Sequence, residues 1–241
     1  MKMKNVLCVA VWVMLGFAFS GCQSIASEST DDIVVRSSVR VAVANPTEDK
    51  CGDFFLLRSM LCRKAFSEAL TNLVMQTGQS EDTLRGATIS EIDEEFENGV
   101  YSLKLDVVWS KTREDAAVRI LTETNVTEAP FDVLTEDEER TLTSWIGPKQ
   151  SLDSEGAIRF LGFSAMAIGR NTVLSRQNIR RAELDARTMA VCAFMGKERK
   201  MTDVKAVFRP VFRKRSHHPL CPDRDMFVCG YEVVSLELPA K

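Results

Sequence analysis

The chain has 241 residues, with 31 Lys or Arg, 34 Asp or Glu and a formal net charge of −3 at pH 7. This length is enough for one large domain or two small ones. The chain is too long, and its apolar residues too periodic, for a small scaffold held together mainly by its seven cysteines.

The first residues have the features of a targeting segment. Lys2 and Lys4 form a positive start, and residues 6–19 are apolar and uncharged. These fourteen residues are too few to cross a bilayer as a helix, which takes about 20. A basic start, a short apolar stretch and small residues after it are typical of a secretory signal peptide.

The next motif, Phe19-Ser20-Gly21-Cys22, resembles the lipobox of bacterial lipoproteins, with Phe19 in place of the usual Leu. The resemblance implies that residues 1–21 are cleaved and that Cys22 carries covalent lipid, with no other cofactor expected. Several acyl chains would anchor the protein stably, because each buried methylene contributes about 0.8 kcal/mol. The alternative is an ordinary secretory signal followed by an incidental cysteine.

The resemblance also implies a location. Gln23 favours the outer membrane over the inner one, so we expect a lipid-anchored protein of the bacterial cell envelope, facing the periplasm or the cell surface. Residues 22–32 are small, polar and acidic, and they predict a flexible lipidated tether. Nucleic acid is excluded as a partner, because the signal directs the chain out of the cytoplasm.

Charge is unevenly distributed along the mature chain. Without residues 1–21, 29 basic and 34 acidic residues give a net charge of −5. Residues 22–155 have 13 basic and 26 acidic residues, a balance of −13, whereas residues 156–241 have 16 and 8, a balance of +8. Such a division indicates two separate modules or a basic face that meets something acidic.

Residues 33–124 are predicted to form a first module. Periodicity of 2 or 3.6 and turn residues define its elements. In chain order they are a strand at 33–44, a helix from Asp53 to about Met75, an irregular acidic stretch at 78–98, a strand at 101–109 and a returning strand at 116–122.

Residues 125–155 are predicted to be a linker, and residues 156–241 a second module. In the linker, Thr135 and Glu138 fit the capping box of a short helix that ends near Trp145. The second module has a strand at 158–168 whose Gly162 indicates a bulge or a close contact. A helix follows from Asn171 or Ser175 to Met195, with a C-cap at Gly196. Two strands come next, at 204–212 and 226–238, joined by a loop at 213–225.

The predicted fold class is α+β, with two β-α-β-β halves in which a long helix packs on a small antiparallel sheet. A duplication would explain the repeated order, and chance similarity is the alternative. Residues between Gly162 and Gly196, with Ala182-Glu183-Leu184-Asp185-Ala186-Arg187, also resemble a module of bacterial surface and flagella-associated lipoproteins. That resemblance implies a helix on a curved sheet and no catalytic residues.

The residues that could bind a metal or form a disulfide lie near the C-terminus. His217, His218, Cys221 and Cys229 could bind zinc or copper as a weak alternative. Their spacing matches no zinc finger or ribbon, so the favoured interpretation is a disulfide between Cys221 and Cys229 in an ordinary loop.

Catalysis is not expected, and the chain is predicted not to be an enzyme. A serine or cysteine nucleophile usually needs a base that a third group orients, and both histidines lie together in one proline-containing loop. No phosphate-binding glycine loop or dinucleotide fingerprint is present. The carboxylates that a hydrolase would need lie in acidic runs typical of solvated surface. An envelope hydrolase is therefore the least favoured function.

Two sets of basic residues suggest contacts. Arg209, Arg213, Lys214 and Arg215 could form a patch for anionic lipid or an acidic partner, or simply the exposed end of a hairpin. The helix of the second module carries further arginines, which we expect to attract the acidic residues at 91–97 or 136–139 of the other half or of another copy. These arginines are Arg176, Arg180, Arg181 and Arg187.

The sequence thus predicts a lipid-anchored envelope protein with a noncatalytic binding or structural body. Its partners would be the membrane, through the anchor, and another envelope protein or a second copy of the chain. The alternative is a lipoprotein that binds a metal or a small ligand through residues 217–229.

Overall fold

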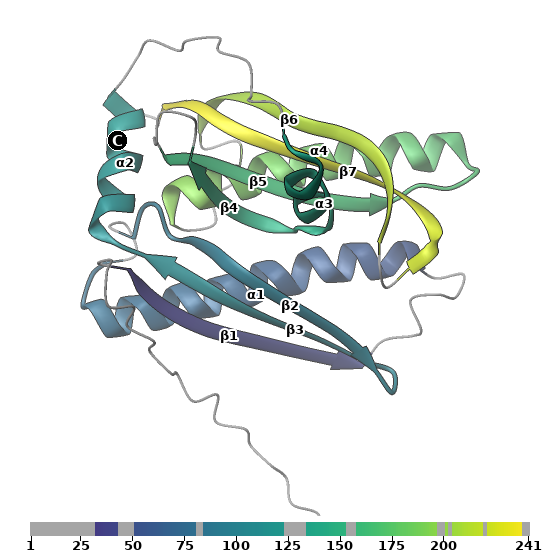
Figure 1. The fold of residues 1–241 in the computed structure, drawn as a ribbon, viewed down its shortest axis with the longest axis horizontal. Helices are drawn as coiled ribbons and strands as arrows, with labels where there is room; N and C mark the ends of the chain where they lie inside the picture. The colour runs from purple at the N-terminus through teal and green to yellow at the C-terminus, as the bar shows by residue number, and fades with distance from the viewer. Residues whose placement is uncertain are drawn as a thin grey trace, which may run out of the picture.

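The computed structural model describes residues 32–42, 51–80, 84–122, 134–152, 158–196, 201, 204–218 and 221–237 (Figure 1). None of the helices in these ranges has an apolar stretch long enough to cross a bilayer. In chain order the elements are β1 (Ile33–Ala42), α1 (Cys51–Thr77), β2 (Thr88–Glu97), β3 (Val100–Trp109), α2 (Lys111–Thr122), α3 (Glu136–Ser144), β4 (Gly147–Leu152), β5 (Ile158–Ala167), α4 (Thr172–Met195), β6 (Lys205–His218) and β7 (Cys221–Glu237).

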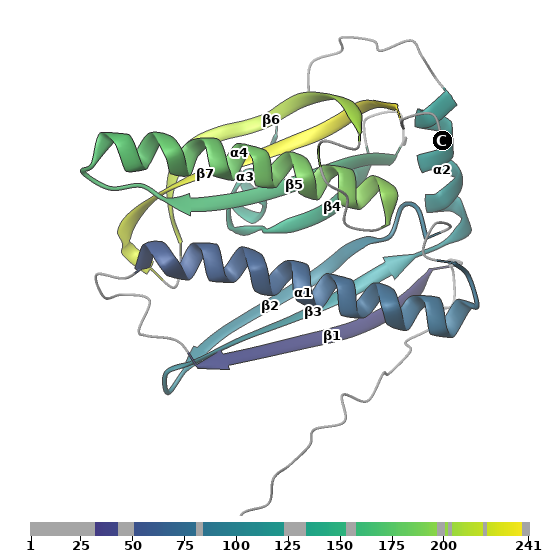
Figure 2. The same cartoon turned by 180° about the vertical axis from the view of Figure 1, so that it is seen from behind.

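The first sheet is antiparallel, with strand order β1-β3-β2. Side chains alternate along β1, where Val35 and Val39 are buried and Arg36 is exposed, as a strand with one buried face requires. The helix α1 covers that face (Figure 2). Its Ala65 and Ala69 are fully buried at a spacing of four residues, which places them on the same side of the helix.

The second sheet is also antiparallel, with strand order β4-β5-β7-β6, and α4 covers one of its faces. Asn171 caps α4 by accepting hydrogen bonds from two backbone N–H groups, and Gly196 ends it in the left-handed conformation. Both helix ends were predicted from the sequence. The predicted close contact at Gly162 is present as well, because the backbone of α4 passes directly over this residue of β5.

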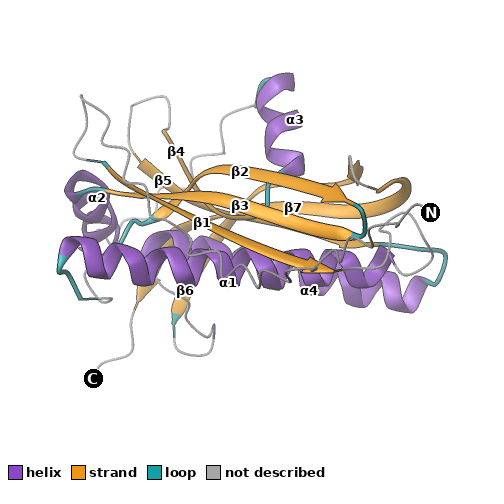
Figure 3. Ribbon diagram, turned by 90° about the horizontal axis from the view of Figure 1, so that it is seen from below, coloured by secondary structure: helices purple, strands orange, loops and turns teal. Residues whose placement is uncertain are grey.

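The two halves form one packed body. Both long helices lie on the same side of the two sheets, and α3 lies on the opposite side (Figures 1, 2 and 3). A single core cluster combines buried residues of α1 and the first sheet with Ala165, Cys192 and Val228 of the second half. The sheets also meet where β2 contacts β4.

The fold is α+β, as predicted. The order β1-α1-β2-β3 with sheet order β1-β3-β2 recurs as β5-α4-β6-β7 with sheet order β5-β7-β6. β4 then adds one strand to the edge of the second sheet. This agreement concerns the order of the elements, and the duplication itself stays a prediction.

Two elements of the first half differ from their prediction. The stretch at 78–98 is not irregular, because it contains β2, in which Ile89 is buried against the core. The segment at 116–122 is not a strand but belongs to α2. Lys111 pairs with Glu114 and Asp115 one turn away, and Ala117 packs into a cluster with the end of α4. Both contacts favour a helix.

Two predicted connections are also strands. The range assigned to the linker contains β4, which pairs with β5. The range assigned to a loop at 213–225 instead continues the ladder between β6 and β7, from Arg213 opposite Cys229 to His218 opposite Cys221. The predicted helix in the linker is confirmed as α3, including the capping box of Thr135 and Glu138.

Candidate functional site

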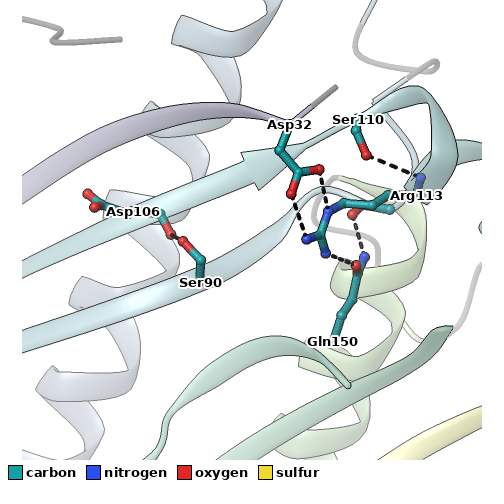
Figure 4. A network of polar contacts seen from close by, with 7 residues as sticks. Asp32, Ser90, Asp106, Ser110, Arg113 and Gln150 are labelled. Carbon is teal, nitrogen blue, oxygen red and sulfur yellow. Dashed lines mark hydrogen bonds and ion pairs between the residues drawn. The ribbon is translucent and has the colours of Figure 1, made fainter. Parts of the chain in front are cut away.

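The predicted lipidation residue, Cys22, lies outside the described residues, and the described chain begins at the end of the predicted tether. Asp32, its first residue, accepts hydrogen bonds from Nε and Nη2 of Arg113, both at 3.1 Å (Figure 4). Arg113 lowers the pKa of Asp32 below its ordinary value through these bonds, and partial burial acts in the opposite direction. The start of the body is therefore fixed by a two-point ion pair.

Arg113 links Asp32 to both halves, and we call the contacts around these two residues the anchor junction, because the predicted tether ends at Asp32. Its Nη1 donates to Gln150 of β4, whose side-chain amide donates to the carbonyl of Gly86 (Figure 4). The Gly86 N–H donates to the carbonyl of Phe194 near the end of α4, at 3.0 Å. Gly86 has φ +78° and lies so close to the Arg113 carbonyl that a Cβ would be 2.5 Å from its oxygen. The junction thus connects α2, β4, the start of β2 and α4.

We predict a pH-dependent effect of Asp32→Ala. Near neutral pH the substitution should lower the free energy of unfolding by about 1 kcal/mol, because two charge-assisted hydrogen bonds are lost at a partly exposed position. The folded pKa of Asp32 is lowered, so its contribution is complete above the unfolded pKa of about 3.9. It is lost as pH falls through the lower folded pKa.

Urea unfolding of a chain that begins at residue 22, at neutral and acidic pH, measures this difference. Asp115→Ala is the control, because the Asp115 side chain is mostly exposed and its loss should change little at either pH. A difference between Asp32→Ala and the unsubstituted chain that stays constant into acid would contradict the ion-pair explanation.

The predicted disulfide between Cys221 and Cys229 is wrong. Cys229 is a free, buried thiol, and both cysteines belong to the single strand β7. Eight residues of strand separate their Cα atoms by about 26 Å, whereas a disulfide needs less than about 7 Å. The prediction failed because it assumed a loop at residues 213–225, where the hairpin of β6 and β7 continues instead.

The weak metal alternative is not assembled by the described residues. His217 is exposed opposite Asp225, four positions along β7 from Cys229, or about 13 Å away in a strand. Burial raises the pKa of the Cys229 thiol to about 12, which disfavours the thiolate that metals bind. The side chains of His218 and Cys221 lie outside the described residues.

The four residues of the predicted basic patch do not share one surface. Arg213 and Lys214 are consecutive in β6 and so point to opposite faces. Arg209 donates to Glu232 at 2.8 and 2.6 Å, Arg213 pairs with Glu183 of α4, and Lys214 pairs with Glu139 of α3. Arg215 is exposed. Three of the four cations are therefore used within the chain.

A groove of about 600 Å³ lies where α3 meets the end of β6. Its lining contains charges of both signs, from Glu136, Glu139, Arg140 and Lys214, and also His217. The ion pair between Lys214 and Glu139 joins its two walls. The sequence predicted neither the groove nor the ion pair, because 75 residues separate the two partners.

The arginines of α4 fall into two groups. Arg187 lies 4.6 Å from the ring centroid of Tyr231 and belongs to the packed interface with β7. Arg176, Arg180 and Arg181 are exposed. Among the described residues, these three side chains form no ion pair.

No protein-family model matches the chain, and no curated protein matches it. A crystal structure at 2.3 Å of the hypothetical protein FTT1539c from Francisella tularensis is similar to it, with a TM-score of 0.51. The two sequences are 11% identical, and the match covers 83% of each chain. At this identity the similarity supports the α+β fold and carries no function.

Proposed function

We propose that this chain is a lipid-anchored protein of the bacterial cell envelope whose noncatalytic body binds another envelope component or a second copy of itself. The observation that carries the proposal is the anchor junction. The part of the body that the structure describes begins at Asp32, ten residues after Cys22, and Arg113 links that residue to both halves. Ten residues span at most about 35 Å, so the lipid would keep the body close to the membrane.

The use of the buried polar groups supports a binding role. Ser59 of α1 and Ser164 of β5 both donate to Asp185 of α4, at 2.6 and 2.7 Å. Arg159 of β5 donates to Glu232 of β7 at 2.8 and 2.7 Å. These groups join packed elements to one another. Such contacts stabilise the body and position its surfaces, whereas an acid or base in catalysis has to reach a substrate.

The outer membrane is the proposed location, and it rests on Gln23 following Cys22 in the lipobox resemblance. Metal or small-ligand binding through residues 217–229 is the less supported function, because His217 and Cys229 lie apart and the Cys229 thiol is buried.

Cys22→Ala tests the anchor. We expect it to abolish incorporation of labelled palmitate and to shift the protein from the membrane fraction to the soluble fraction or to an unprocessed precursor, because the acylated sulfur is lost. Cys8→Ala is the matched control, since Cys8 belongs to the predicted signal peptide and should not be needed for labelling. Unchanged labelling and unchanged membrane retention in Cys22→Ala would reject the proposal.

A further inference from the structure

The exposed side of α4 is both cationic and apolar. Arg176, Arg180 and Arg181 are exposed there without an ion pair to any described residue. Leu174 and Leu184 are each more than half exposed on the same helix. The opposite side of α4, with Ala182, Ala186 and Ala190, is the one buried against the second sheet. We call the exposed set, completed by Val173, the α4 face.

The outer side of β2 is acidic. Glu91, Glu95 and Glu97 are exposed, while the intervening Ile92 and Phe96 pack toward the core of the first sheet. Asp93 has a partner on the same sheet, because it accepts a hydrogen bond from Lys104 at 3.3 Å. Like charges on alternate residues of one strand repel each other, and cations from outside would relieve this repulsion. Glu95 and Glu97 form no ion pair with any described residue, and Glu91 interacts electrostatically with Arg36 of β1. We call these three glutamates the β2 face.

These two faces cannot meet within one molecule. The β2 face points away from α1, because the neighbouring Glu94 is the residue held by Arg58 of α1. The α4 face is opposite the side of α4 that is buried against the second sheet, and both long helices lie on the same side of the two sheets (Figures 2 and 3). In the described fold, the predicted attraction between these arginines and glutamates therefore cannot act within one molecule.

The spacing of the charges matches between the two faces. Arg176 and Arg180 are four residues apart in a helix, a rise of about 6.0 Å. Glu95 and Glu97 are two residues apart in a strand, a rise of about 6.8 Å. A helix laid along β2 can therefore present successive arginines to successive glutamates. Val100, which is opposite Glu97 in the ladder and partly exposed, provides apolar surface beside them for the exposed leucines.

We propose that the protein associates head to tail, with the α4 face of one copy bound to the β2 face of the next. This inference rests on the proposed function and names its partner as a second copy. Because the two faces differ, a dimer leaves one α4 face and one β2 face unoccupied. Further copies can then add to form a ring or an open row. Exposed ion pairs are individually weak, but anchoring all copies in one membrane raises their effective concentration.

Cysteine cross-linking of the acylated full-length chain in envelope membranes tests the contact. Gln177 is exposed next to the arginines of the α4 face, so Gln177→Cys combined with Glu95→Cys should give a ladder of dimers, trimers and higher species on a non-reducing gel. Either substitution alone should give at most dimers. The parent chain, with its own cysteines, sets the baseline.

Charge reversal then tests the electrostatic basis. In the double-cysteine chain, Arg176→Glu with Arg180→Glu should reduce the ladder about tenfold, because like charges then face each other. Adding Glu91→Arg with Glu97→Arg should restore it. Lys64→Glu is the matched control, since Lys64 is an exposed cation of α1 outside both faces, and it should leave the ladder unchanged.

The remaining outcomes separate this inference from the proposed function. If the chain is retained in the membrane through Cys22 but no ladder forms, the head-to-tail contact is wrong and the anchored function stands. A ladder without Cys22-dependent retention would support the contact and reject the anchor. If anionic vesicles, but not zwitterionic ones, protect Gln177→Cys from a water-soluble thiol reagent, the α4 face lies on lipid and the inference is overturned.

Discussion

Arg58→Met is expected to lower the free energy of unfolding by about 3–5 kcal/mol, because it breaks an ion pair whose arginine is fully buried. Only 1% of Arg58 is exposed. Its guanidinium donates to both carboxylate oxygens of Glu94, each at 2.6 Å, and to the carbonyl of Ser144 at 2.7 Å. The substitution would remove three hydrogen bonds that join α1 to β2 and to the end of α3.

Tyr101 does not replace Arg58. Its hydroxyl donates to the same Glu94 carboxylate. Burial, with a further contribution from Glu94, raises the pKa of Tyr101, so the phenol stays a neutral hydrogen-bond donor and brings no positive charge to Glu94. Adding Glu94→Leu to Arg58→Met should recover part of the loss, because the pair is then replaced as a unit rather than broken.

Arg36→Met provides the matched control for Arg58→Met. Arg36 also donates to both oxygens of a carboxylate, that of Asp106, at 2.7 Å each, but its side chain is 54% exposed. Its removal should therefore lower the free energy of unfolding far less than removal of the buried Arg58. Urea denaturation of a chain that begins at residue 22 measures both variants. Equal losses for Arg58→Met and Arg36→Met would show that burial does not govern the strength of these ion pairs.

The elements that the sequence predicted are those whose signals are local. The helix α4 has its capping Asn171 and its terminal Gly196 at its own ends, and α3 carries its whole capping box in four residues. Both were predictable because cap residues satisfy backbone groups of their own helix. The alternation along β3 is local in the same way.

The elements that were missed depend on distant partners. The strand β2 was not predicted because its many acidic side chains are typical of an exposed loop. One of them, Glu94, faces inward because it pairs with Arg58, which is 36 residues away in the sequence. The sequence of β4, Gly-Pro-Lys-Gln-Ser-Leu, has no apolar alternation, and it is a strand because β5 provides its hydrogen bonds. In such segments the contacts of the folded protein, and not the strand propensity of the residues, decide the secondary structure.

In the candidate site, too, local features could be predicted and contacts between distant residues could not. The Cys22 motif is four consecutive residues, so the lipidation site could be predicted from the sequence, and it stays a prediction. The anchor junction could not, because 81 residues separate Asp32 from Arg113. The basic patch was predicted from cations that are neighbours in sequence. Alternation along β6 places Arg213 and Lys214 on opposite faces, and carboxylates from α4 and α3 pair with them.

Gly162→Ala is expected to lower the free energy of unfolding by about 3 kcal/mol or more, although it adds only one methyl group. A Cβ at Gly162 would lie 2.1 Å from the carbonyl oxygen of Ala186 and 2.1 Å from the backbone nitrogen of Ala190. Both atoms belong to the backbone of α4, so no side-chain rotation can relieve the clash. The helix would have to move away from β5 as a unit.

That movement would disturb contacts along the whole length of α4. Asp185 would separate from Ser164 of β5, whose hydroxyl now donates to it at 2.7 Å, and the packing of Phe194 against Phe160 would loosen. Gly169→Ala is the matched control, because a Cβ there meets no atom within 4 Å, and it should change stability by less than about 0.5 kcal/mol. Urea denaturation compares the two, and a Gly162→Ala chain as stable as Gly169→Ala would mean that α4 does not approach β5 this closely in solution.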